Sequence, residues 1–314
     1  MLELSARLLA GVLFLLIGGC GGTLQTRAVL DAPSDQLVRR AELADVPFHA
    51  QEDYQCGPAA LAMVLNAAGV AADPEGLKPE VYLPQRQGSL QVEMLAAVRR
   101  HGVVAYQLVP ELANLLAEVA DGTPVIVLQN LGLGWYPVWH YAVVIGYDLE
   151  RREVILRSGR EQRQVLPMTT FERTWARSGY WAMLALPPGR IPRSAGEASF
   201  VSAVSALERA GHLRGARSAY LAAVQRWPQS LAARIGAGNT AYRTKDLVQA
   251  EADFRQAVAA HPDSVAALNN LAQTLSDLGR DEEALLYAQR AVELGGPLGE
   301  VARETLEGIR RKLE

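Results

Sequence analysis

Apolar residues recur at two different spacings along this chain, and the change of spacing indicates where helices give way to strands. A spacing of three or four residues is typical of amphipathic helices, and it predicts helices over 58–68, 89–101 and 110–120. Short β-branched runs predict strands over 124–128, 141–147, 153–156 and 180–186. Helices followed by strands predict an α+β domain with an antiparallel sheet over residues 41–187.

Residues 188–196 are rich in proline and glycine and predict a linker. Beyond it nearly every residue is a helix former, and small residues recur with a period of 34 at Ala216, Ala250 and Ala284. A second set in the same register is Ala223, Ala257 and Ala291. This pattern resembles the tetratricopeptide repeat (TPR), an all-α solenoid.

The expected units are 197–230, 231–264 and 265–298, followed by a capping helix over 299–313. Gly238 and Ala272 stand where the two helices of a unit must approach closely. The leading aromatic of the repeat is present only as Phe200, so the units are degenerate. Because each repeat is stabilised by its neighbours, we expect the two halves of the chain to fold separately.

The N-terminus predicts export. A short apolar run over 8–17 has the length of a signal-peptide core and is too short for a comfortable membrane span. The sequence Ile17-Gly18-Gly19-Cys20 that follows resembles a bacterial lipobox. The resemblance implies a signal peptide over 1–20, lipid on Cys20, a tether over 21–40 and sorting to the outer membrane, facing the periplasm. The alternative is an ordinary signal peptide or anchor helix in which Cys20 is incidental.

Composition narrows the classes of function. With 49% hydrophobic and 21% charged residues the chain can bury a large core, and its net charge of −3 gives no support to a nucleic-acid partner. The sequence holds no metal-ligand cluster, phosphate-binding glycine loop or dinucleotide fingerprint, so we expect no cofactor. If Cys20 carries lipid, Cys56 is the only thiol of the mature chain and has no disulfide partner.

Cys56 is a candidate nucleophile. It precedes Gly57 and Pro58 at the predicted start of a helix, where proline fits the first turn. Free amide groups and the positive end of the helix dipole favour a thiolate there and lower the pKa of the thiol. The backbone N–H of Cys56 can also help to hold an oxyanion. The alternative is a buried structural cysteine.

A cysteine nucleophile needs a base, and His140 is the best candidate among the five histidines. It directly precedes the predicted strand 141–147. The alternative is a histidine at a strand end that only meets water.

The segments Cys56-Gly57-Pro58-Ala59-Ala60-Leu61 and His140-Tyr141-Ala142-Val143-Val144-Ile145-Gly146-Tyr147 resemble those of the bacteriocin-processing peptidases, which cleave leader peptides after a double glycine. These enzymes belong to the papain-like cysteine peptidases, and phytochelatin synthase has a similar nucleophile segment. The resemblance covers residues 43–187 and implies that Cys56 is the nucleophile, His140 the general base and acid, and Gln51 an oxyanion donor.

Two features depart from that family. Gln51 stands five residues before Cys56, one fewer than usual. The family orients its histidine with an Asp or Asn on the next strand, whereas this chain has Leu156-Arg157-Ser158 there. Ser158 or a backbone carbonyl could accept the imidazole N–H instead, and Asp148 fits a turn residue better than an orienting carboxylate.

Three hypotheses remain open at this point. The first is a membrane-anchored thiol peptidase that cleaves peptides through a thioester on Cys56, while the TPR repeats recruit a protein partner. The second is a γ-glutamyl or other amide transferase, in which an amine or thiol captures the acyl-enzyme. The third is a lipid-anchored scaffold whose peptidase-like domain binds peptides without cutting them; the missing Asp or Asn favours it, and the retained Cys56 argues against it.

Overall fold

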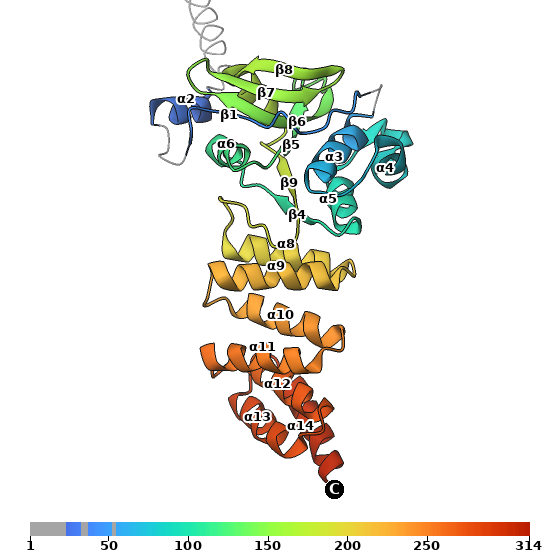
Figure 1. Cartoon of the computed structure of the whole chain (residues 1–314), viewed down its shortest axis with the longest axis vertical. Helices are drawn as coiled ribbons and strands as arrows, with labels where there is room; N and C mark the ends of the chain where they lie inside the picture. Colours follow the sequence, from blue (N-terminus) through green and yellow to red (C-terminus); the bar gives the residue numbers. More distant parts are fainter. Residues whose placement is uncertain (1–22, 33–36, 52–54) are drawn as a thin grey trace, which may run out of the picture.

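A computed structural model of the protein describes residues 23–32, 37–51 and 55–314. The N-terminal part forms a sheet with helices on both faces, and the C-terminal part is a column of helices that extends away from it (Figure 1). The predicted α+β fold followed by an all-α repeat is confirmed.

The sheet has seven strands in the order β4-β9-β5-β6-β7-β8, with β1 also paired to β6, and every pair is antiparallel. The long strand β6 pairs with β5 over 139–144, and β1 occupies the same edge of β6 over 146–148. The bounds are β1 Arg40–Glu42, β4 Val104–Gln107, β5 Val125–Asn130, β6 Trp139–Asp148, β7 Glu153–Ser158, β8 Glu161–Pro167 and β9 Ala182–Leu186.

Helices cover both faces of this sheet, which is why its central strands are largely apolar. Alternate residues of β5 enter different cores: Val125 and Val127 pack on one side, Ile126 and Leu128 on the other. The second core holds α3 (Cys56–Ala67), α4 (Pro74–Val81) and α5 (Gln91–Arg100), and the first holds α6 (Leu112–Ala120) and α7 (Met168–Ala176). A small hairpin of β2 (Tyr82–Leu83) and β3 (Gly88–Ser89), with the 3-10 turn η1 (Pro84–Arg86), connects α4 to α5.

One expectation about the N-terminus is wrong. Residues 21–40 were predicted to be a tether, but Leu24–Asp31 form helix α2, which lies against α6 and α7. The buried Glu172 accepts hydrogen bonds from the backbone N–H groups of Gln25 (3.0 Å) and Thr26 (2.7 Å), so a carboxylate satisfies the free amides of the first turn. In the part of the chain that the structure describes, no helix is both long and apolar enough to cross a membrane.

Each expected repeat unit contains one pair of antiparallel helices, and a single helix follows the third pair. The bounds are α8 Glu197–Arg209, α9 Leu213–Arg226, α10 Leu231–Arg243, α11 Leu247–Ala260, α12 Val265–Asp277, α13 Asp281–Leu294 and α14 Gly299–Leu313. The segment 188–196 between β9 and α8 contains no helix or strand.

The close approach expected at Gly238 is present. A Cβ atom at this position would lie 2.4 Å from Cε1 of Phe254, so the aromatic ring of α11 occupies the space that any larger residue of α10 would need. In the third unit the ring is replaced by the buried Ala288, and the position of the glycine is taken by Ala272. The small residue and the aromatic ring are therefore complementary in volume.

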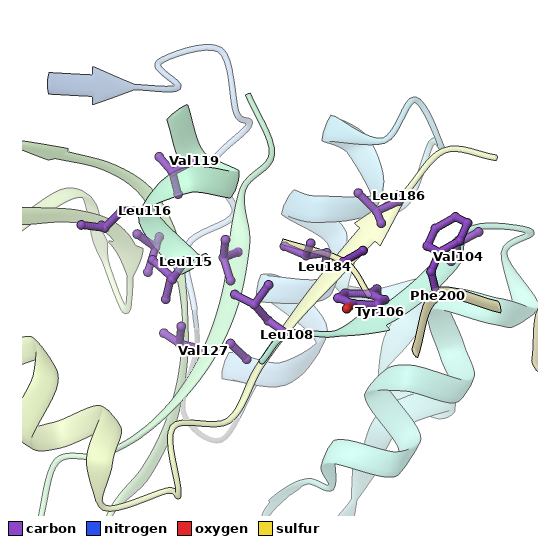
Figure 2. Close-up of a cluster of buried hydrophobic side chains, with 14 of the residues drawn as sticks. Val104, Tyr106, Leu108, Leu115, Leu116, Val119, Val127, Leu184, Leu186 and Phe200 are labelled. Atoms are coloured by element: carbon purple, nitrogen blue, oxygen red, sulfur yellow. The ribbon is translucent and has the colours of Figure 1, made fainter. Parts of the chain in front are cut away.

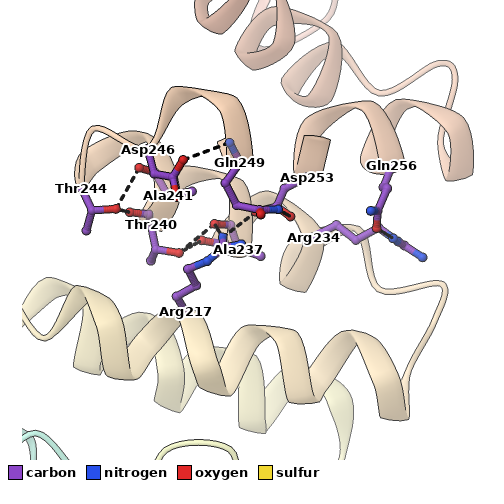
Figure 3. A network of polar contacts seen from close by, with 11 residues as sticks. Arg217, Arg234, Ala237, Thr240, Ala241, Thr244, Asp246, Gln249, Asp253 and Gln256 are labelled. Atoms are coloured by element: carbon purple, nitrogen blue, oxygen red, sulfur yellow. Dashed lines mark hydrogen bonds and ion pairs between the residues drawn. The ribbon is translucent and has the colours of Figure 1, made fainter. Parts of the chain in front are cut away.

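Polar contacts also join the repeats (Figure 3). Arg217 of α9 donates to the backbone oxygen of Ala237 in α10 at 2.7 Å and to the largely buried carboxylate of Asp253 in α11 at 2.5 Å. Gln249 donates to the other oxygen of that carboxylate at 3.0 Å. This network fixes the first unit against the second.

The repeats do not stand apart from the sheet. Helix α8 packs on β4, and the buried ring of Phe200 belongs to the same core as Val104 and Leu186 of the sheet (Figure 2). That core continues without interruption into α9 and α10. The two halves thus share a core, which the expectation of separate folding did not include.

Candidate active site

Cys56 is the first residue of α3, where the amide groups of the first helical turn have no helical partner. The helix packs against β6, and the backbone amides of Tyr141, Gly57 and Cys56 itself each favour the thiolate form of the thiol. The nucleophile candidate therefore faces the beginning of β6, the strand that carries His140.

Gly57 is required by a close neighbour. A Cβ atom here would lie 2.3 Å from Oγ of Ser89 in the β2–β3 hairpin and 3.4 Å from Sδ of Met94 in α5. The hairpin can approach the N-terminus of α3 only because residue 57 has no side chain.

His140 is oriented by a neighbouring strand. Its Nε2 atom lies 2.9 Å from Oγ of Ser158, the last residue of β7, whose side chain is buried. Since β6 and β7 are adjacent antiparallel strands, the hydroxyl stands at the position where the sequence leaves an Asp or Asn missing. The contact engages Nε2, so Nδ1 is the ring nitrogen left for another partner.

Gln51 connects strand β6 to the residue that follows strand β7. Its Nε2 donates to the carbonyl of Tyr141 at 3.2 Å, and its Oε1 accepts the backbone N–H of Gly159 at 3.0 Å. Its own backbone N–H donates to the carbonyl of Gly159 at 2.9 Å. A side-chain amide nitrogen carries two hydrogens, so one donor of Gln51 is not used in these contacts.

The side chains of Gln51, Cys56 and His140 line one open cavity of about 1080 Å³. Three arginines also line it, Arg86, Arg160 and Arg177, and no Asp or Glu of the described residues does. The loop between β5 and β6 forms one wall through Tyr136, Pro137 and Val138, and Trp139 at the start of β6 continues it; Trp135 of the same loop is 82% exposed. The described part of the cavity wall therefore carries cationic and aromatic side chains.

Burial determines the charge state of the resting pair. Loss of water raises the pKa of the Cys56 thiol above its usual 9.0, because it outweighs the three backbone amides that favour a thiolate. Loss of water also lowers the pKa of His140 to about 4. The sequence predicted a lowered thiol pKa, and this is wrong for the resting site: thiol and imidazole are both neutral at pH 7.

The other sequence candidates lie elsewhere. The carboxylate of Asp148 accepts the backbone N–H of Arg151 at 2.9 Å in the turn after β6, about 25 Å along the strand from His140. His49 and His101 are bound to Asn66 and Glu80. Cys20 lies outside the described residues. Within the described ranges, no three His, Cys, Asp or Glu residues are grouped as a metal site would need.

Sequence reasoning missed Tyr141 and Ser89. Tyr141 supplies a backbone N–H to the thiol, donates its hydroxyl to the carbonyl of Ser89 at 3.2 Å, and packs edge-on against Trp181. Its position directly after His140 was the available signal, because the backbone of a residue next to the candidate base lies at the same site.

Comparison with known families agrees with this geometry. Residues 43–183 match the Peptidase C39 like family, and residues 202–255 and 248–297 match the tetratricopeptide repeat. The chain joins a peptidase C39-like domain to tetratricopeptide repeats. No curated protein gives a match to the chain.

Solved structures with a similar fold come from both classes. A putative C39-like peptidase from Bacillus anthracis is 20% identical over 50% of this chain and 100% of its own, with a TM-score of 0.41. The first TPR domain of Spaghetti (RPAP3), bound to an HSP90 peptide, is 21% identical over 37% of this chain and 94% of its own (TM-score 0.36). YrrB, a TPR protein with an unusual peptide-binding site, is 25% identical over 35% of this chain and 57% of its own (TM-score 0.32).

Proposed function

We propose that this protein is a cysteine peptidase in which Cys56 is the nucleophile, His140 the general base and acid, Gln51 an oxyanion donor and Ser158 a positioning residue. One observation carries the proposal: Cys56 and His140 line the same cavity, and Ser158 holds the imidazole by Nε2. With Ser158 as acceptor, Nε2 keeps its proton and Nδ1 presents a lone pair to the thiol.

In this mechanism His140 takes the thiol proton as the sulfur attacks the peptide carbonyl, because the resting pair is neutral. The oxyanion is stabilised by the backbone N–H of Cys56 and the free amide hydrogen of Gln51. His140 then protonates the leaving amine, and water hydrolyses the thioester.

The repeats would bind a protein or peptide partner, since the first TPR domain of Spaghetti is bound to an HSP90 peptide and YrrB has a peptide-binding site. Lipid on Cys20 would hold the protein in the bacterial cell envelope, at the outer membrane facing the periplasm.

The test is turnover of a peptide library by the full-length chain in non-ionic detergent. We expect cleavage that is lost in both Cys56→Ala and His140→Ala, with the double variant no worse than either, since the pair acts as a unit. Asp148→Asn is the matched control and should retain activity. Capture of the acyl group by an added amine or thiol in preference to water would instead identify a transferase.

A second candidate is a peptide-binding scaffold without catalysis. The neutral resting pair favours it, because neither group is activated before a ligand arrives. Peptide binding that is unchanged in Cys56→Ala, together with no turnover of any peptide, amide or thioester, would establish the scaffold and contradict the peptidase.

A further inference from the structure

A second pocket lies at the seam between the two domains. It has a volume of about 320 Å³ and is formed by α5 and β4 of the peptidase-like domain and by α8 of the first repeat. It has no lining residue in common with the cavity that holds Cys56. Nothing in the proposed peptidase mechanism uses it.

Two arginines from different domains face this pocket, Arg99 of α5 and Arg209 of α8, and no Asp or Glu of the described residues lines it. Nε of Arg99 is buried and has no hydrogen-bond partner within the described structure. Burial lowers the pKa of Arg99, and the charge of Arg209 lowers it further, because the two cations repel each other. An uncompensated buried guanidinium donor is costly.

The neighbouring carboxylates do not relieve this charge. Glu208, next to Arg209, accepts from Tyr220 at 3.0 Å and from Arg243 at 2.9 Å. Glu80 is bound to Arg100, next to Arg99, at 2.8 Å and to His101 at 3.0 Å. Both acidic groups are thus engaged with other partners, and among the described residues Arg209 donates only to the neutral hydroxyl of Ser205, at 2.8 Å.

The other lining residues suit a small ligand that has a polar group and a short apolar substituent. Hydroxyl groups are present on Tyr106, Ser199 and Ser202, and those of Tyr106 and Ser199 are 3.0 Å apart. Ser199 also donates to the carbonyl of Gly196 at 2.9 Å, so this pair is already oriented. The remaining wall is largely alanine and leucine side chain.

We propose that the seam pocket binds a small oxyanion, a carboxylate or a phosphate, between Arg99 and Arg209. Guanidinium groups recognise both anions through paired N–H donors. Such an anion would compensate both arginines at once, and it would join the first repeat to α5. Met94 of α5 lies beside Gly57, so the ligand would also stiffen the helix that supports the nucleophile.

The test is thermal unfolding of the full-length chain in non-ionic detergent, at ionic strength held constant with NaCl. The probes are inorganic phosphate, N-acetylalanine and its uncharged match N-acetylalaninamide. We expect Tm to rise with the logarithm of the anion concentration above Kd, by about 5 °C at a hundredfold excess over Kd, with one or both anions, and not to rise with the amide. A response to phosphate alone would assign a phosphate ligand, and a response to N-acetylalanine alone a carboxylate.

Arg99→Gln and Arg209→Gln should each abolish the response without lowering Tm in anion-free buffer, because each removes like-charge repulsion. Arg214→Gln, on an exposed arginine of α9 that does not line the pocket, should leave it intact. Ser202→Glu supplies a carboxylate from within, so it should raise the basal Tm and remove the response. An equal Tm shift in all variants, or no Tm shift with either anion, would overturn the proposal.

Discussion

The Nε2 atom of His140 and the Oγ atom of Ser158 are 2.9 Å apart, on adjacent strands β6 and β7. A hydroxyl accepts an N–H as a carboxylate does but carries no charge, so it can orient an imidazole without stabilising an imidazolium. This agrees with the lowered pKa of His140, about 4, for which burial is the cause. The site is built to position a neutral base.

Ser158→Ala should therefore lower kcat by about tenfold and leave KM nearly unchanged, which is the usual loss for one neutral hydrogen bond. Ser158→Thr keeps the hydroxyl and should recover most of the activity. Asp148→Asn, in the turn after β6, serves as the silent control. If Asp148→Asn were as damaging as His140→Ala, the assignment of Ser158 would be contradicted.

The charge state of the thiol can be measured by the pH dependence of alkylation. Because burial raises the pKa of the Cys56 thiol above its ordinary value, only a small fraction should be thiolate at pH 7, and the rate with iodoacetamide should still be rising at a pH where that of a free cysteine has levelled off. Mass spectrometry of Cys56 at each pH gives this rate.

The variant His140→Ala distinguishes a neutral thiol and imidazole from a thiolate–imidazolium pair. In a neutral pair the histidine contributes no positive charge, so the variant should be alkylated at pH 7 as slowly as the parent chain. Fast alkylation at pH 6 that is lost in His140→Ala would reveal a thiolate–imidazolium pair and return the site to what the sequence predicted.

Gln51 has a structural and a proposed catalytic role, and two variants distinguish them. Gln51→Glu keeps the acceptor for Gly159 but has no N–H, so turnover should fall by about 10²–10³, the usual loss for an oxyanion donor. In Gln51→Ala, turnover should fall as far. This variant should also lose about 1–3 kcal/mol of stability, because the N–H of Gly159 and the carbonyl oxygen of Tyr141 lose their partner. If both retain full turnover, Gln51 is only structural.

The sequence predicts the apolar elements well, because burial imposes their pattern. The strand over 141–147 is found at Trp139–Asp148, and the helix over 58–68 at Cys56–Ala67. It misses β8, an edge strand of polar and largely exposed residues over 161–167, since nothing in an unburied strand requires apolar side chains. It misses α4, which contains Pro79 within the helix.

The sequence identifies the residues of the site better than it predicts their chemistry. Cys56 and His140 follow from local motifs, whereas the thiol pKa depends on how much water the folded cavity removes from it. Local reasoning found the helix N-terminus, which favours a thiolate, and could not weigh the burial that opposes it. The arginines of the seam pocket, 110 residues apart, could not be paired from the sequence for the same reason.

In the repeats, two helical glycines provide a matched pair of substitutions. Gly238→Ala would bring a Cβ to 2.4 Å from the buried ring of Phe254, and we expect a loss of about 1–3 kcal/mol despite the better helix propensity of alanine. Gly308→Ala in α14 meets nothing within 4 Å and should stabilise by up to about 1 kcal/mol. Urea unfolding measures both; the same sign for the two variants would contradict the packing argument.

The shared core determines how the two halves of the chain unfold. The ring of Phe200 lies in α8 and is fully buried against Val104 of the sheet (Figure 2). A fragment of residues 197–314 would expose this face of α8 to water. Fully burying a large apolar side chain is worth about 1.5–3 kcal/mol, so the first repeat should be the least stable part of the fragment.

We therefore expect the intact chain to unfold in one cooperative transition, and the fragment 197–314 to melt at lower temperature with α8 frayed. Phe200→Ala should cost about 3–5 kcal/mol in the intact chain and much less in the fragment, where the ring has already lost the sheet. Leu286→Ala, on the 65% exposed side chain of α13, is the control and should be near neutral in both. Circular dichroism and calorimetry follow the two transitions. Two separate transitions in the intact chain, with an equal Phe200→Ala effect in chain and fragment, would show that the halves are independent after all, because the sheet would then contribute nothing to the stability of α8.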